Sequence, residues 1–462
     1  MIPAVTRFAR TKTALVIASA TAVVAGALLL SGRRAAVKID GPDTADAGGI
    51  TLTARPTSGA ILRGTSETHV AITIRTPDSS EHARPPIALA VVLDTSGSMA
   101  GSKIEHAKAA ARHLIDELGD GDRFALISFS THAELLLPMT EATADAKQRA
   151  TQAIGGLYAD GGTNISDGLT IGSQAISGSA DERVRRIVLI SDGKPQQDGI
   201  TDADALIAFS GEIATRGVSI STVGVGLDFD EHIMTGISVA ARGNYYFVED
   251  TAQLAGMFDH ELDSLGRTVA SYANVTIVPA PGVEILDAYG YRTTVSEGRT
   301  IIPISDLRAG ETRKVVVRVR VTAGAAGSME LGNVTLTYAP QGDQMRKLSV
   351  VARTAITDEE SVVAANLDKD TVRQVEQART ANALEEATAA YEKGDDAKAR
   401  MILDQRAHEA QAAGAAVNDP ALAEQVQTIT TKTQAGFAAP PADDSGRRAV
   451  KATRLDAYEM AR

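Results

Sequence analysis

The chain of 462 residues has no cysteine and no tryptophan, and aromatic residues make up only 4% of it. Without cysteine it forms no disulfide, offers no thiolate as a nucleophile or metal ligand, and carries no lipid on a cysteine. Any hydrophobic core must therefore be built mainly from aliphatic side chains. Hydrophobic residues, at 44% of the chain, are numerous enough for that.

Several functional signatures are also missing. The net charge of −12 argues against nucleic acid as a partner, because phosphate binding requires clustered Lys and Arg. The sequence has no Gly-x-Ser-x-Gly elbow and no phosphate-binding Gly-x4-Gly-Lys-Ser/Thr loop. His106 and His113 lie seven residues apart, outside any His-Glu-x-x-His pattern, so we read them as solvated histidines rather than zinc ligands. We therefore do not expect an enzyme.

Only one stretch is apolar and long enough to cross a membrane. Residues 13–31 carry no charge, and a helix of that length spans about 28 Å, close to the hydrocarbon thickness of a bilayer. The Ala-x-Ala arrangements that could serve as cleavage sites lie inside this run rather than after it, and Arg33 and Arg34 follow at once. We favour a single-pass signal-anchor in the cytoplasmic membrane over a cleaved signal peptide of a secreted protein. In both cases the bulk of the chain lies outside the cytoplasm, in the periplasm or the extracellular space.

Hydrophobic patterning divides the rest of the chain. Between residues 87 and 266, apolar runs typical of buried strands alternate with segments of helical spacing, which predicts an α/β unit with a doubly wound, mostly parallel six-stranded sheet. Period-two alternation appears before it, at 50–74, and after it, at 275–338. The early strands cannot bury their apolar face alone. We infer that they pair with the later ones, which makes the α/β unit an insertion in one β-sandwich.

From residue 357 the chain becomes rich in Ala, Glu and Lys and predicts a helical region. The stretch 390–403 resembles half of a tetratricopeptide hairpin, but one copy cannot build a solenoid, so we expect a helical hairpin that serves as a structural appendage. Asp419-Pro420 begins a last predicted helix. The tail from residue 435 is expected to be disordered.

Side chains with oxygen donors follow two of the predicted buried strands. Asp94, Ser96 and Ser98 come directly after the run at 87–93, Asp192 closes the run at 187–191, and Thr163 follows two glycines in a loop. In an open parallel sheet, ligands bind outside the carboxyl ends of strands where the strand order reverses. Neighbouring strands would bring these five side chains together, and oxygen-only donors suit a hard divalent cation. The sequence therefore predicts a metal site for Mg²⁺, with Mn²⁺ or Ca²⁺ not separated by donor type.

Such a site favours binding over chemistry. Hydroxyl oxygens donate weakly and two carboxylates neutralise the ion only partly, so the metal stays electrophilic. An octahedral ion with few protein ligands keeps an open position. A carboxylate from another protein would fill it, which predicts metal-dependent binding of an acidic side chain of a partner.

These elements resemble the von Willebrand factor type A domain with a complete metal-ion-dependent adhesion site. The resemblance rests on Asp94-x-Ser96-x-Ser98, on Gly161-Gly162-Thr163-Asn164 and on Ser191-Asp192-Gly193, in that order. It implies that Ser96, Ser98 and Thr163 contact the metal, while Asp94 and Asp192 act directly or through water. The order of segments is similar to that of bacterial exported or membrane-anchored members of the family.

The predicted organisation has seven parts. They are a cytoplasmic N-terminus at 1–12, the signal-anchor at 13–32, a linker with the first sandwich strands at 33–85, the von Willebrand factor type A domain at 86–266, the rest of the sandwich at 267–356, a helical hairpin and final helix at 357–434, and the tail at 435–462.

Two other functions stay open on the sequence. The chain could be an accessory or adaptor subunit of an ATPase or transporter assembly, because related domains act as adaptors, or a channel regulator, because some chloride-conductance proteins contain this domain. A single apolar span makes a conducting pore a poor interpretation. We expect a non-enzymatic protein-binding module whose partner is a protein; the oligomeric state is open.

Overall fold

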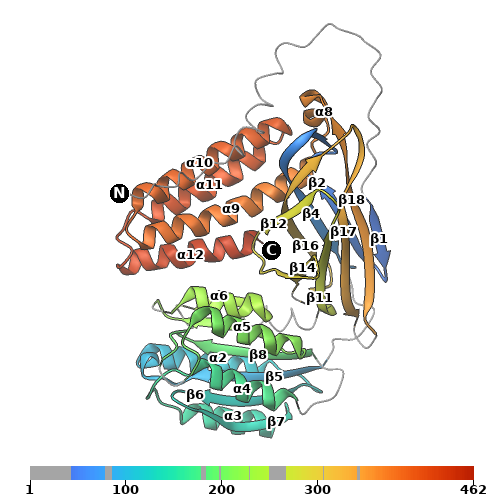
Figure 1. Cartoon of the computed structure of the whole chain (residues 1–462). Coiled ribbons are helices and arrows are strands. Elements are labelled where there is room, and N and C mark those ends of the chain that lie inside the picture. The colour runs from blue at the N-terminus through green and yellow to red at the C-terminus, as the bar shows by residue number, and fades with distance from the viewer. Residues whose placement is uncertain are drawn as a thin grey trace, which may run out of the picture.

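The computed structural model describes residues 43–78, 86–177, 184–196, 199–227, 229–248, 267–304, 306–340 and 344–461. The predicted signal-anchor lies outside these ranges, as do residues 249–266 at the end of the predicted α/β unit. Among the described residues no helix is both long and apolar enough to cross a membrane. Figure 1 shows three parts: an α/β unit, a β-sandwich and a bundle of helices that lies beside the sandwich and above the α/β unit.

The α/β unit contains the predicted six-stranded sheet. Its strand order is β10-β9-β8-β5-β6-β7, parallel except for β7, which pairs antiparallel with β6. Both neighbours of β5 come later in the chain, so the strand order reverses at β5. All eight residues of β5 are buried. The strands are β5 (Ile87–Asp94), β6 (Arg123–Phe129), β7 (Ala133–Glu141), β8 (Val184–Ser191), β9 (Ser219–Val225) and β10 (Arg242–Val248).

Helices cover both faces of this sheet. One apolar core lies between the sheet and α2 and α3, and a second lies between the opposite face and α4, α5 and α6. The helices are η1 (Gly97–Met99), α2 (Ser102–Asp116), α3 (Ala144–Gly155), α4 (Ile165–Ser177), α5 (Ala203–Thr215) and α6 (Glu231–Ala240). Crossovers of this kind bury parallel strands completely, which explains their uninterrupted apolar runs.

Strands from before and after the α/β unit form one β-sandwich around a shared core. The first sheet has the order β1-β2-β4-β16-β12 and the second β13-β14-β11-β17-β18-β3, with β15 beside β11. β4 pairs with β16 along its whole length, from Gly64 opposite Ala323 to Arg75 opposite Thr312. The α/β unit is thus an insertion between β4 and β11, as the alternation predicts. The strands are β1 (Thr44–Ala47), β2 (Ile50–Pro56), β3 (Ala60–Leu62), β4 (Gly64–Arg75), β11 (Thr268–Pro279), β12 (Val283–Ala288), β13 (Thr294–Ser296), β14 (Arg299–Pro303), β15 (Leu307–Arg308), β16 (Thr312–Ala323), β17 (Gly327–Pro340) and β18 (Arg346–Thr357).

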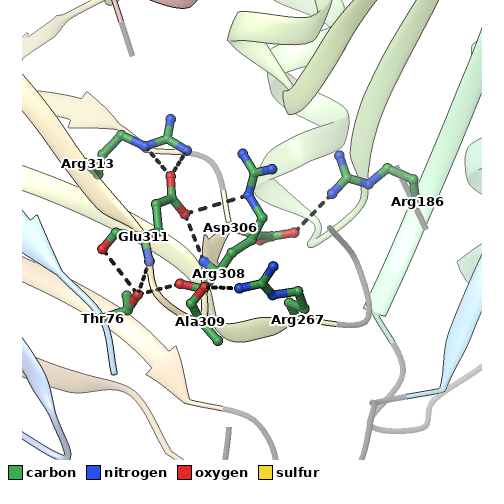
Figure 2. Close-up of polar contacts among 8 residues, drawn as sticks. All are labelled: Thr76, Arg186, Arg267, Asp306, Arg308, Ala309, Glu311 and Arg313. Atoms are coloured by element: carbon green, nitrogen blue, oxygen red, sulfur yellow. Dashed lines mark hydrogen bonds and ion pairs between the residues drawn. The ribbon is translucent and has the colours of Figure 1, made fainter. Parts of the chain in front are cut away.

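A polar junction joins the sandwich to the base of the α/β unit. Arg186 on β8 points across to Asp306 of the sandwich, at 3.3 Å, while its other terminal nitrogen donates to Ser221 at 3.0 Å (Figure 2). The Arg186 side chain is only 3% exposed. On the sandwich side, the same figure shows Glu311 held by Arg313 and Arg308. Because Arg186 lies near the amino end of β8, this junction leaves the carboxyl ends of the strands on the far side.

The helical region follows the sandwich and reaches nearly to the C-terminus. Its helices are α8 (Glu360–Ala365), α9 (Lys369–Glu392), α10 (Asp396–Ala416), α11 (Pro420–Gly436) and α12 (Asp444–Met460). The prediction of a disordered tail from residue 435 is wrong for α12. Val450 and Ala457 pack into the bundle core with Leu384 and Phe437, and Tyr458 packs against the α/β core. Its apolar residues, among them Val450 and Ala457, recur at helical spacing, so the mixed charge and the prolines of the tail misled the prediction.

Candidate metal centre

The chain turns sharply where β5 ends, and hydrogen bonds to the Asp94 carboxylate fix that turn. The Asp94 carboxylate accepts a hydrogen bond from the Ser96 backbone N–H at 2.8 Å and another from the Ser191 hydroxyl at 2.5 Å. The second bond ties the end of β5 to the end of β8. Asp94 is fully buried, and burial raises its pKa to about 7, although the bonds from Ser191 and Ser96 oppose the rise.

The loop that carries Thr163 is tied to this turn through the backbone. The Gly97 N–H donates to the Gly161 carbonyl at 3.0 Å. Gly161 has a φ of +80°, and a Cβ there would lie 2.9 Å from the Thr131 hydroxyl, so the close approach requires glycine. Thr163 itself is 2% exposed, and its carbonyl accepts from the Gln196 N–H of the loop after β8. Three loops therefore meet at one edge of the sheet.

Asp192 lies in the loop directly after β8 and contacts two further elements. Its carbonyl accepts a hydrogen bond from the Asp230 N–H at 3.3 Å, which links the loop to the start of α6. Its carboxylate oxygen Oδ2 lies 3.2 Å from the Lys103 ammonium of α2. The side chain of Asp192 is 1% exposed. Lys103 thus belongs to the same cluster as the predicted ligands.

Two buried oxygens in this cluster have no hydrogen-bond partner. They are the Thr163 hydroxyl oxygen and Oδ1 of Asp192. A buried polar atom without a partner costs roughly 1–3 kcal/mol, so each such atom is expected to bind a water or a ligand. The Ser96 and Ser98 hydroxyls lie 3.0 Å from each other, and Ser98 is exposed, which leaves the cluster open to solvent on that side. The donor set fits a hard divalent cation with access from outside.

All five predicted site residues lie at the carboxyl edge of the sheet, on the loops after β5 and β8 and before α4. Among the described residues no group of three or more His, Asp or Glu side chains gathers, and this cluster has only two carboxylates beside its hydroxyls. Sequence reasoning missed two participants. Ser191 could have been found from its place in Ser191-Asp192-Gly193. No sequence pattern marks Lys103, because its ion pair joins residues 89 positions apart.

Asp230, in the loop after β9, has a structural role. Asp230 accepts a hydrogen bond from the Ile233 N–H at 3.1 Å and so caps the N-terminus of α6. Asp228 lies outside the described residues. Asp230 therefore has a structural task and also reaches Asp192 through its backbone N–H.

Residues 88–260 match the family model of the von Willebrand factor type A domain. The chain contains a von Willebrand factor type A domain. Domains of this type, hereafter A domains, are often involved in protein binding and adhesion. In this chain the A domain is the inserted α/β unit, and the cluster lies at the top of its sheet.

Relatives extend the likeness beyond the A domain. The chain is 26% identical to the Synechocystis sp. protein sll0103 over 297 residues, which cover 62% of this chain and 69% of that protein. It is 33% identical to human inter-alpha-trypsin inhibitor heavy chain H4 over 150 residues, but these cover only 16% of the human protein. The solved structure of a von Willebrand factor type A protein from Catenulispora acidiphila aligns with 91% of this chain and 99% of its own, with a TM-score of 0.70 and 19% identity. That structure shares the fold, including the sandwich and the helices.

Proposed function

We propose that this protein is a non-enzymatic binding module whose A domain holds a divalent cation, Mg²⁺ by preference, and uses it to bind an acidic side chain of a protein partner. Ser96, Ser98 and Thr163 would contribute hydroxyl oxygens, and Asp94 and Asp192 carboxylates, directly or through water. The cation would supply an electrophilic centre with a free coordination position.

The observation that carries this proposal is the pair of unpartnered oxygens on Thr163 and Asp192. Each is buried and each belongs to a different loop, so no rearrangement within one loop would satisfy both. The hydrogen bonds between Gly97 and Gly161 and between Ser191 and Asp94 hold those loops together. A preorganised site of this kind spends little free energy on ordering its ligands.

The proposed location follows from the N-terminal sequence. A signal-anchor at 13–32 would display the A domain on the outer side of the cytoplasmic membrane, where its top edge would face partners. If the segment is cleaved instead, the same module would be secreted. Neither case changes the chemistry of the site.

Calorimetric titration of Mg²⁺, Mn²⁺ and Ca²⁺ into the region from Arg33 onward tests the proposal. We expect one-site binding in the wild type, and at least about a tenfold loss of affinity in Thr163→Val, which removes one ligand oxygen and little volume. The matched control is Thr170→Val on α4, whose hydroxyl bonds only to its own helix at Ser166 among the described residues.

Equal affinities in the wild type and Thr163→Val would refute the assignment of the site. If the wild type binds Mg²⁺ but captures the same proteins from an extract of its source with and without chelator, the metal is structural and the adhesion part of the proposal is wrong.

A further inference from the structure

Tyr158 lies in the loop that leads from α3 to the cluster and carries Thr163. At 75% exposure it is the only exposed aromatic side chain among the described residues. Its neighbours Leu157 and Ala159 pack against the core between the sheet and α2 and α3. Burial therefore alternates along the loop, with Leu157 and Ala159 turned inward and Tyr158 and Asp160 turned outward. The Tyr158 ring is thus held in solvent by neighbours that are anchored on both sides.

Backbone hydrogen bonds place this part of the loop beside the predicted metal ligands. The Asp160 N–H donates to the Thr95 carbonyl at 2.8 Å, and Thr95 directly precedes Ser96. One residue further on, the Gly161 carbonyl accepts the hydrogen bond from Gly97 described above. These two bonds tie the loop to the turn after β5 within three residues of Tyr158. The ring therefore lies at the same edge of the sheet as the cluster.

Asp160 presents its carboxylate on the same outer side as the Tyr158 ring. Alternating burial is typical of an extended segment, in which side chains two residues apart share a face at a spacing of roughly 7 Å. Oδ1 of Asp160 accepts a hydrogen bond from the Gly161 N–H at 2.8 Å, which orients the carboxylate. Both side chains are exposed, so a partner reaches them without any rearrangement of the loop.

An aromatic face next to a carboxylate favours a cation as its ligand. The face of a tyrosine ring attracts a positive charge, and the carboxylate pairs with the same charge. An apolar side chain would contact the ring but would displace water from Asp160 without replacing its hydrogen bonds. Arginine fits best, because its planar guanidinium both stacks on rings and donates to carboxylates.

We propose that Tyr158 and Asp160 form a second contact for the protein partner, next to the metal, and that this contact binds a basic side chain, Arg in preference to Lys. The inference rests on the proposed function, in which an acidic side chain of the same partner binds the cation. Neither Tyr158 nor Asp160 belongs to the metal ligands. The two residues therefore select among acidic partners, in favour of those that carry a basic residue near the acidic one.

A library of displayed peptides with one fixed aspartate in random flanking sequence tests this inference. The immobilised protein captures peptides in a single round at saturating Mg²⁺, a parallel capture in chelator gives the background, and sequencing reads both pools. For the wild type we expect Arg and Lys to be enriched at least about fivefold over Ala at a position near the aspartate, since a cation–π contact and an exposed ion pair add their effects.

Four variants assign the preference to the loop. In Tyr158→Ala and in Asp160→Asn we expect the enrichment of basic residues to fall at least about twofold. Tyr158→Phe keeps the aromatic face and should retain the enrichment of the wild type. Asp116→Asn is the matched control, because Asp116 is also exposed but ends α2 at the opposite edge of the sheet, and it should leave the enrichment unchanged. Calorimetric titration of each variant sets the saturating Mg²⁺ concentration and confirms that the metal site is retained.

The outcomes separate the two proposals. If the wild type captures no peptide in a Mg²⁺-dependent manner, the proposed function is overturned and this inference with it. Mg²⁺-dependent capture without a preference for Arg or Lys overturns this inference alone. A preference that persists unchanged in Tyr158→Ala or in Asp160→Asn would place the basic contact elsewhere, and the assignment to this loop would be wrong.

Discussion

The contact between α12 and the A domain depends on a buried ion pair. Lys451 of α12, whose side chain is 2% exposed, pairs with Glu231 at the start of α6, which is 8% exposed. The Lys451 ammonium also lies 3.5 Å from the centre of the Phe229 ring. Arg454 contacts the other Glu231 oxygen at 3.2 Å. Figure 1 shows α12 lying along the top of α6, so this pair joins the helical bundle to the A domain.

Substituting either Lys451 or Glu231 by an uncharged residue leaves the charge of the other buried. Breaking a buried pair in this way costs about 3–5 kcal/mol. For Glu231→Gln we expect the contact to lose about 3 kcal/mol of stability, because the Lys451 ammonium still lies over the Phe229 ring. For Lys451→Met we expect a loss of about 2 kcal/mol of stability, because Arg454 still neutralises Glu231. The double variant should cost at least about 2 kcal/mol less than the sum of the single ones, since it leaves neither charge without its partner.

Amide hydrogen exchange of α12, read by mass spectrometry, measures the free energy of opening of this contact in each variant. The control is Lys432→Met, which removes an exposed pair with Asp456 between α11 and α12, and should cost less than about 1 kcal/mol. If the effects of Lys451→Met and Glu231→Gln add within about 0.5 kcal/mol, the two residues are not coupled and the reasoning fails.

Three further predictions concern other parts of the molecule. Gly224→Ala would place a Cβ 2.6 Å from the Phe229 ring, and we expect it to lower the free energy of unfolding by about 1–3 kcal/mol in urea titrations; an unchanged midpoint would contradict this packing. Arg186→Met removes the ion pair at the base of the A domain. We expect it to lower the free energy of unfolding by about 3 kcal/mol and to lower the melting temperature. Burial and nearby arginines lower the pKa of His69 to about 3, below its unfolded value of 6.5. The unfolded chain therefore takes up the proton first, and the free energy of unfolding should fall by about 1.4 kcal/mol per pH unit as the pH drops from 6.5 toward 3. His69→Phe should reduce the dependence of stability on pH. An equal pH dependence in the wild type and the variant would contradict the assignment of this effect to His69.

The sequence predicts the A domain well, because its strands are buried on both faces and all the predicted site residues except Thr163 lie at or directly after the ends of those strands. Alternation in 50–74 and 275–338 likewise predicts the sandwich and its interruption, since period two leaves one face that needs a partner. The prediction of a disordered tail misses α12, although apolar residues recur there at helical spacing. No local pattern shows that Lys451, at 2% exposure, is buried, because its partner Glu231 lies on α6. Lys103 is missed for the same reason: its role comes from a tertiary ion pair, which no local pattern records.

The insertion of the A domain into the sandwich dictates an order of folding. Strands β1 to β4 leave the ribosome first, yet Arg75 of β4 pairs with Thr312, and the entire A domain is synthesised between them. Until β16 arrives, the apolar face of β2 and β4 has no permanent cover, and such exposed strands are prone to aggregate. The A domain is synthesised, and can fold, while these four strands still lack their partners. Any substitution that slows the A domain would therefore lengthen the exposure of strands it never touches, and would appear as a loss of yield rather than of binding.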